Sequence, residues 1–164
     1  MNDVDAALQY LHFPGHVYTS VIQKLGQLKK PHVAFFLFQW LLLSHPELPN
    51  VYIYSSLLSV MKGHGGNLEQ FSYVMEQMQK HNIQPNLVTY NNMIECYERQ
   101  RLHFEAMKAF QELTNNGLTP NHATFRALLW GSTEASDVAS ALQTYRTARD
   151  MLVKAGMNDA IEEL

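Results

Sequence analysis

The stretch that decides the fold runs from Leu87 to Asn121 and reads LVTYNNMIECYERQRLHFEAMKAFQELTNNGLTPN. Its apolar residues recur three and four positions apart, which is the spacing of one face of a helix. The first such series is Tyr90, Met93, Ile94 and Tyr97, and the second is Ala106, Phe110 and Leu113. A short polar segment, residues 99–103, separates them, so the stretch predicts a helical hairpin.

The end of this hairpin carries its own signals. Gly117 follows the second helix where a residue with positive φ is favoured, and Asn82 takes the same place one copy earlier. Pro120 prevents the helix from continuing, and Asn121 can cap the helix that comes next.

The same pattern occurs four times along the chain. Pro-Asn pairs stand at residues 49–50, 85–86 and 120–121, and an aromatic residue lies four positions after each asparagine. The aligned aromatic residues are Tyr18, Tyr54, Tyr90 and Phe125, at spacings of 36, 36 and 35. One hairpin cannot bury its apolar face alone, so neighbouring copies must stack.

We therefore expect an all-α fold, a right-handed superhelical solenoid of helix-turn-helix repeats that forms a single domain. The expected repeats are residues 15–50, 51–86, 87–121 and a degenerate fourth copy, 122–158, whose helices are separated by residues 131–136. Residues 1–14 are expected to form a leading helix or cap. Residues 159–164 are expected to form a tail or a second cap.

Composition supports a folded domain and excludes several classes of protein. Of 164 residues 46% are apolar and 16% charged, a globular balance. Cys96 is the only cysteine, which excludes an intramolecular disulfide and a zinc site built from several cysteines. The apolar run 34–43 is half the length of a membrane span, so Phe35–Phe38 and Trp40 are expected in the core. The acidic N-terminus has no leader pattern; the protein stays where it is made, or a leader precedes this sequence.

The third copy resembles the pentatricopeptide repeat family, in plant-like organellar form. The resemblance rests on Val88-Thr-Tyr-Asn-Asn-Met-Ile94, on Glu105-Ala106 with Phe110, and on Gly117-Leu-Thr-Pro-Asn121, and it extends over roughly residues 15–158. It implies a protein that binds single-stranded RNA, one nucleotide per repeat, in organellar RNA processing, splicing or stabilisation. It also implies an organellar location, with the chloroplast favoured over the mitochondrion.

The resemblance also implies which residues contact the RNA. In each repeat two positions specify a base: the residue after the first-helix aromatic and the last residue of the repeat. Here the pairs are Thr19 with Asn50, Ser55 with Asn86, and Asn91 with Asn121. All six are short hydroxyl or amide residues, which can both donate and accept hydrogen bonds to a base edge. By the family's code they correspond to the register A-A-C.

Further positions follow from the same resemblance. The base-packing residues are His16, Tyr52 and Val88. In the fourth copy Arg126 replaces the short polar residue, so it is a candidate phosphate contact or a salt-bridge partner. Lys24 is a second candidate phosphate contact, and a solvated turn is the alternative.

Two alternatives stay open from the residues alone. The three asparagines can be helix caps and nothing more. The chain can also be a protein-interaction scaffold or a structural subunit of an organellar ribonucleoprotein or transcription complex, with protein partners or self-association. We expect no enzyme, no cofactor, no metal site and no membrane partner. His103-Phe-Glu105 matches half of a zinc deaminase motif, but the Cys-x-x-Cys half is missing, so we do not expect the family's editing extension here.

The net charge of −3 opposes RNA binding at first sight, because nucleic-acid binders are usually basic. The acidity lies at the ends, since residues 1–14 and 122–164 each carry a charge of −2. Residues 15–121 carry eight bases and seven acids. Binding by this chain would therefore depend on base-edge contacts and stacking more than on phosphate attraction.

Overall fold

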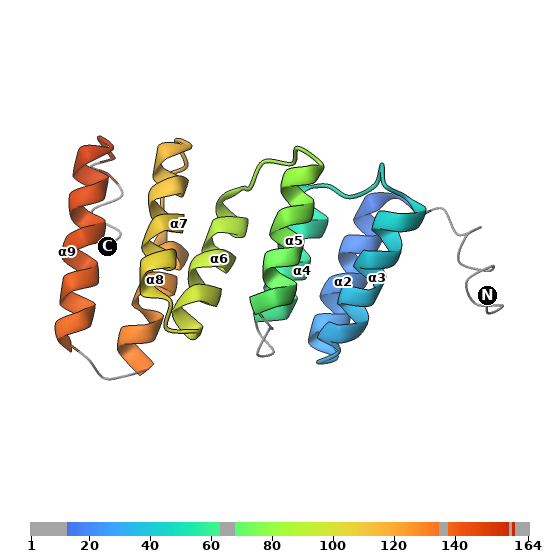
Figure 1. The fold of residues 1–164 in the computed structure, drawn as a ribbon, viewed down its shortest axis with the longest axis horizontal. Helices are drawn as coiled ribbons and strands as arrows, with labels where there is room; N and C mark the ends of the chain where they lie inside the picture. Colours follow the sequence, from blue (N-terminus) through green and yellow to red (C-terminus); the bar gives the residue numbers. More distant parts are fainter. Residues whose placement is uncertain (1–12, 63–67, 135–137, 158, 160–164) are drawn as a thin grey trace. The chain divides into compact units, whose positions relative to one another are not determined.

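The computed structural model describes residues 13–62, 68–134, 138–157 and 159, and the long regular elements in this part of the chain are all α-helices (Figure 1). In chain order they are α2 (Gly15–Gln27), α3 (Pro31–Ser44), α4 (Val51–Lys62), α5 (Leu68–Lys80), α6 (Leu87–Arg99), α7 (His103–Asn115), α8 (His122–Glu134) and α9 (Val138–Lys154). They alternate as first and second helices of the repeats. Because these elements are all helices, the all-α prediction is confirmed. Most of the predicted leading helix and of the C-terminal tail lies outside the described residues.

The helices group into two units, residues 1–84 and 85–164. In the first unit α2 packs against α3 and α4, and α4 packs against α5. In the second unit α6 packs against α7 and α8, and α8 packs against α9. Within each unit, the first helices of successive repeats therefore lie against one another, as stacked repeats require.

The repeated aromatic residue of each first helix lies in the core. Tyr18, Tyr54, Tyr90 and Phe125 are all at most 5% exposed. The apolar residue four positions further on is fully buried in the first three copies, where it is Ile22, Leu58 and Ile94. Removing an apolar side chain of this size from water stabilises the fold by about 1.5–3 kcal/mol. Each of these repeats therefore contributes a similar stabilising residue at the same position.

Two of these aromatic residues also join the two helices of their hairpin through the phenol oxygen. The Tyr54 oxygen lies 2.7 Å from Nδ1 of His81, and Asn116 donates to the Tyr90 oxygen at 2.8 Å. Both partners follow the last residue of the second helix of the hairpin. Burial, with a smaller contribution from Tyr73, raises the pKa of Tyr54 to about 12, so the phenol stays neutral at physiological pH.

The helices end in the left-handed turns that the sequence indicated, and in others that it did not, at Lys29, Arg101 and Gly156. Asn82 and Gly117 have φ of 53° and 72°, which confirms both predictions. Lys29 and Arg101 have φ of 56° and 59° at the turn between the two helices of their repeats. Each is followed by a backbone N–H bonded to a carbonyl five residues earlier, at 2.9 Å. Long basic side chains give no sequence signal for this conformation, which is uncommon outside glycine and asparagine.

Helix α8 contradicts the expected inter-helix segment of the fourth copy. Residues 131–134 are helical and α8 ends at Glu134, whereas the loop was predicted to begin at Gly131. An internal glycine costs a helix only about 1 kcal/mol, which the packing of α8 against α6 and α9 offsets.

The aromatic cluster of α3 is only partly in the core. Phe38 is fully buried but Phe36 is 65% exposed, which corrects the prediction for this residue. Two positions correspond to about 200° around a helix, so the two rings cannot share one buried face. No helix among the described residues has the length and apolarity needed to cross a bilayer.

The contact of α2 with α4 requires glycine at position 26, because there is no room there for a side chain. A Cβ atom there would lie 2.6 Å from Cγ2 of Val60, whose χ1 angle is restricted because it is β-branched. We expect Gly26→Ala to lower the free energy of unfolding by about 1–2 kcal/mol, because overpacking exceeds the gain in helix propensity. Urea denaturation measures this.

The matched control combines Gly26→Ala with Val60→Ala, which removes the clashing methyl groups. The double variant should lose less stability than the two single variants together. Strict additivity would show that this contact does not limit the helix spacing.

Candidate functional site

All three asparagines that end a repeat cap the next first helix. Asn50 Oδ1 accepts the backbone N–H groups of Tyr52 and Ile53 at 3.0 and 3.2 Å. Asn86 Oδ1 accepts the N–H of Thr89 at 2.9 Å, and Asn121 Oδ1 accepts that of Thr124 at 3.2 Å. The capping role is therefore real at each position, and it fixes which atom of each amide faces the helix. A second role has to use the remaining NH₂ group.

Members of the first two predicted pairs donate hydrogen bonds to nearby backbone carbonyl oxygens. Thr19 donates to the carbonyl oxygen of Gly15 at 3.2 Å, within its own helix. Asn50 Nδ2 donates to the carbonyl oxygen of Leu48 at 3.4 Å. Ser55 is buried in the first unit and donates to the carbonyl oxygen of Tyr52 at 3.3 Å, while Asn86 belongs to the second unit.

The third pair is brought together. Nδ2 of Asn91 on α6 donates to Oδ1 of Asn121, before α8, at 3.4 Å. Asn91 is 9% exposed and Asn121 is exposed, so the pair lies at the edge of the core with one member in solvent. Two amides from successive repeats at this distance can present adjacent polar atoms to one ligand.

A third residue, Thr124, completes this cluster, and it was not among the predicted site residues. Its hydroxyl donates to Asn91 Oδ1 at 2.7 Å and accepts the backbone N–H of Asn121 at 3.1 Å. The sequence signal was present as Asn-x-x-Thr, a capping pattern with its polar partner three residues on. It was missed because threonine is less usual there than glutamate or glutamine.

The predicted base-packing residues are accessible. His16 is exposed, Tyr52 is 67% exposed, and Val88 is 52% exposed although it is apolar. Tyr52 and Val88 each occupy the second position of a first helix, beside the capping asparagine. An exposed apolar or aromatic group next to amide donors can pack against a flat ring.

The two predicted phosphate contacts and Arg99 differ in how available their charges are. Arg126 on α8 is exposed and forms no ion pair with any residue that the structure describes. Lys24 is exposed and donates to the side chain of Gln27 at 3.2 Å. Arg99 on α6 is held instead, because Glu95 binds it at 2.9 Å and its guanidinium lies 4.2 Å from the ring centre of Trp130.

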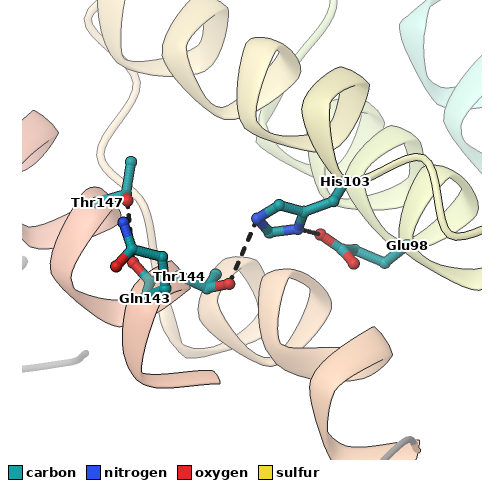
Figure 2. A network of polar contacts seen from close by, with 5 residues as sticks. All are labelled: Glu98, His103, Gln143, Thr144 and Thr147. Atoms are coloured by element: carbon teal, nitrogen blue, oxygen red, sulfur yellow. Dashed lines mark hydrogen bonds and ion pairs between the residues drawn. The ribbon is translucent and has the colours of Figure 1, made fainter. Parts of the chain in front are cut away.

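A second polar cluster connects the α6–α7 hairpin to α9. Figure 2 shows Glu98 beside His103, with Oε1 to Nδ1 at 2.7 Å, and Nε2 of His103 facing the Thr144 hydroxyl at 3.4 Å. Acid, imidazole and hydroxyl stand in the order of a catalytic triad. Thr144 is only 1% exposed, so a substrate cannot reach this hydroxyl. The cluster therefore holds elements together rather than performing chemistry.

The single cysteine gives no nucleophile. Cys96 is buried, and burial raises its pKa to about 11, so the thiol form dominates at neutral pH. Across the described residues, no three His, Cys, Asp or Glu side chains are close enough to hold a metal ion.

Two protein-family models match this chain. The PPR repeat family matches residues 85–132 and the pentatricopeptide repeat domain matches residues 48–100. Together the two matches extend over more than half of the chain. The chain belongs to the pentatricopeptide repeat family.

Two similar proteins come from Arabidopsis thaliana. The chloroplastic protein LOW PHOTOSYNTHETIC EFFICIENCY 1 is 30% identical over 112 residues, which is 65% of this chain and 16% of that protein. The small ribosomal subunit protein mL103 (rPPR7) is 26% identical over 113 residues, which is 69% of this chain and 27% of that protein. This pentatricopeptide repeat chain therefore spans only about a sixth to a quarter of these curated relatives.

The fold matches a solved repeat structure. The maize protein PPR10, in complex with an 18-nt psaJ RNA element, aligns with a TM-score of 0.71 at 21% identity. The alignment covers 94% of this chain and 25% of PPR10. At this identity the likeness establishes the fold alone, an α-helical repeat solenoid.

The Glu98–His103 pair makes stability depend on pH. Burial raises the pKa of Glu98, while its bond to His103 opposes the shift. Because the folded pKa lies above the unfolded one, this contribution to stability is complete below pH ~4.3 and is lost as pH rises through the folded pKa. We expect the stability of Glu98→Gln relative to wild type to increase from pH 4 to pH 7, as measured by urea denaturation.

The matched control is Glu76→Gln, which removes an exposed carboxylate that pairs with Lys80. If the stabilities of both variants relative to wild type change identically with pH, burial of Glu98 is not the cause of the pH dependence.

Proposed function

We propose that this chain binds single-stranded RNA with base selectivity, about one nucleotide per repeat. The observation that carries the proposal is the Asn91–Asn121 pair, whose two amides meet at 3.4 Å at the edge of the core. The exposed Val88 beside them offers an apolar surface on which a base can pack. Membership of the family and the RNA in the PPR10 complex support the same partner.

Free donor groups at the third pair favour particular bases. Asn121 Oδ1 is occupied by the cap, and its Nδ2 donates to no described residue. Cytosine presents two adjacent acceptors, N3 and O2, at its Watson–Crick edge, which suits amide donors. The proposed register is A-A-C, with cytosine at the third repeat.

Affinity for a short RNA is expected to be weak. Base stacking contributes about 1–3 kcal/mol per base, and association costs offset much of three such contacts. Arg126 is the proposed phosphate contact nearest in sequence to the third pair, and Lys24 is the one in the first repeat. The chain would act by occupying or remodelling RNA.

The proposed setting is an organelle, with the chloroplast favoured. The first similar protein is chloroplastic and the second is a ribosomal subunit protein, both from a plant. RNA processing, splicing and stabilisation all fit a protein that acts through occupancy.

A second function is a protein-interaction scaffold. It is favoured by exposed apolar side chains of α3, since Phe36 is 65% and Leu43 is 85% exposed beside a pocket of about 440 Å³ that Tyr73 of α5 also lines. Resemblance to a ribosomal subunit protein points the same way. Fluorescence anisotropy at low salt, with AAC-containing RNA against scrambled and polyU RNA, separates the two functions. Absence of any RNA binding would favour the scaffold.

Asn121→Asp tests the base-specifying role without removing the cap. A carboxylate oxygen still accepts the helix N–H groups, so we expect the free energy of unfolding to change by under ~1 kcal/mol. The NH₂ donors disappear, and we expect preference at the third base to move from cytosine towards bases with an N–H at that edge. Anisotropy titrations with four RNAs that differ at this base measure the change.

Asn50→Asp is the matched control, because it makes the same change at the cap of α4. It should leave selectivity at the third base unaltered. If Asn121→Asp changes stability alone, Asn121 is a cap and nothing more.

A further inference from the structure

Thr124 lies in the first turn of α8 and is fully buried, yet its hydroxyl contacts both members of the third pair. We propose that Thr124 is a positioning residue that fixes the amide of Asn91 and thereby sets base selectivity at the third repeat. The inference rests on the proposed function and adds to it a residue outside the two base-specifying positions.

The first step is the orientation of Asn121. Its Oδ1 lies 3.1 and 3.2 Å from the backbone N–H groups of Ala123 and Thr124. An NH₂ group at that place would face two donors, so the oxygen must occupy it. The cap therefore determines which end of the Asn121 amide points outward, and that end is the NH₂ group.

The second step is the orientation of Asn91. The atom of Asn91 that faces Asn121 Oδ1 at 3.4 Å must be nitrogen, because two carbonyl oxygens would repel each other there. Asn91 Oδ1 then faces Thr124, whose hydroxyl donates to it at 2.7 Å. The short bond holds the amide in this orientation and occupies its oxygen.

The consequence is a pair that presents donors. Asn121 Oδ1 accepts from two backbone groups and from Asn91, and Asn91 Oδ1 accepts from Thr124. The hydrogens left over belong to the two NH₂ groups. Such a pair suits the adjacent acceptors of cytosine better than uracil, which has an N–H between its two oxygens.

The other repeats give an internal comparison. At the position of Thr124, the helix that follows the first repeat carries Ile53, which has no hydroxyl, and there Thr19 bonds to its own helix instead. The helix that follows the second repeat carries Thr89, whose hydroxyl donates to Asn86 Oδ1 at 3.0 Å. In the third repeat the threonine hydroxyl contacts both members of the predicted pair, Asn91 and Asn121.

The test compares Thr124→Val with Thr124→Ser in the full chain. Valine keeps the shape and loses the hydroxyl, so Asn91 Oδ1 loses the donor that occupies it and becomes able to accept the N–H of uracil. We expect the ratio of affinities for AAC and AAU RNA to fall roughly three- to tenfold, the worth of one hydrogen bond. Serine keeps the hydroxyl and should restore the wild-type ratio.

Thr89→Val is the matched control for destabilisation, because it removes a capping hydroxyl at the same position of α6 and leaves Asn91 and Asn121 unchanged. It should weaken the fold without changing the ratio. An unchanged ratio in Thr124→Val, or an equal fall in Thr89→Val, would overturn the role of Thr124.

A second measurement separates this inference from the proposed function. The side-chain NH₂ signals of Asn91, followed by ¹⁵N NMR without RNA, should lose exchange protection in Thr124→Val and keep it in Thr124→Ser. If wild type binds none of the RNAs, the proposed function and the selectivity role both fail, whatever the NMR signals show. If it binds selectively and the NH₂ signals do not respond to Thr124→Val, the positioning role alone fails.

Discussion

Each first helix that follows a Pro-Asn pair begins where an asparagine oxygen accepts backbone N–H groups that have no partner inside the helix. Much else in the molecule depends on this interaction. It starts the helix at a defined residue, which brings the aromatic residue four positions later into the core. It also leaves one end of the amide pointing away from the helix. Fold and candidate function therefore share a single side chain, and a change at that side chain has to preserve its oxygen.

Because the same asparagine side chain can cap a helix and face a ligand, a helix cap and a recognition residue are hard to tell apart. At Asn50 the amide nitrogen is directed to the carbonyl oxygen of Leu48, whereas at Asn121 it has no partner among the described residues. The residue types are identical and their surroundings differ. What separates the two positions is the partner in the preceding first helix, Thr19 in one case and Asn91 in the other. A repeat protein can thus keep one capping device throughout while varying what it offers to a ligand.

Much of the fold could be predicted from the sequence. Its 35- to 36-residue period appears in residues that end a helix, cap a helix or face the core, and each of these roles depends on neighbours close in sequence. Gly117 and Asn82 indicate their turns because both residue types favour positive φ, and the repeated aromatic residues indicate the core. Lys29 and Arg101 adopt the same left-handed turn without any such preference, and in each case the next backbone N–H closes the turn on a carbonyl five residues earlier. The extension of α8 beyond residue 131, to Glu134, follows from its packing against α6 and α9.

The candidate site was predicted less completely for a related reason. Its outer residues occupy family positions, but Thr124 acts through a hydrogen bond between two repeats, 33 residues apart from Asn91. Spacing along one helix cannot reveal that contact. Phe36 shows the converse error, since a run of apolar residues conceals which face of α3 is covered.

The position of Arg99 has a consequence for the ionic behaviour of the chain. Its charge is paired with Glu95 and covered on one side by Trp130, so it is not available to displace counterions from a phosphate backbone. Each phosphate neutralised on a single strand adds roughly 0.7 to the slope of log affinity against log salt. With the charge of Arg99 paired in this way, the proposed RNA binding would depend less on salt concentration than on the identity of the bases. Such a surface would bind through chemistry that persists at ionic strengths where purely electrostatic binders dissociate.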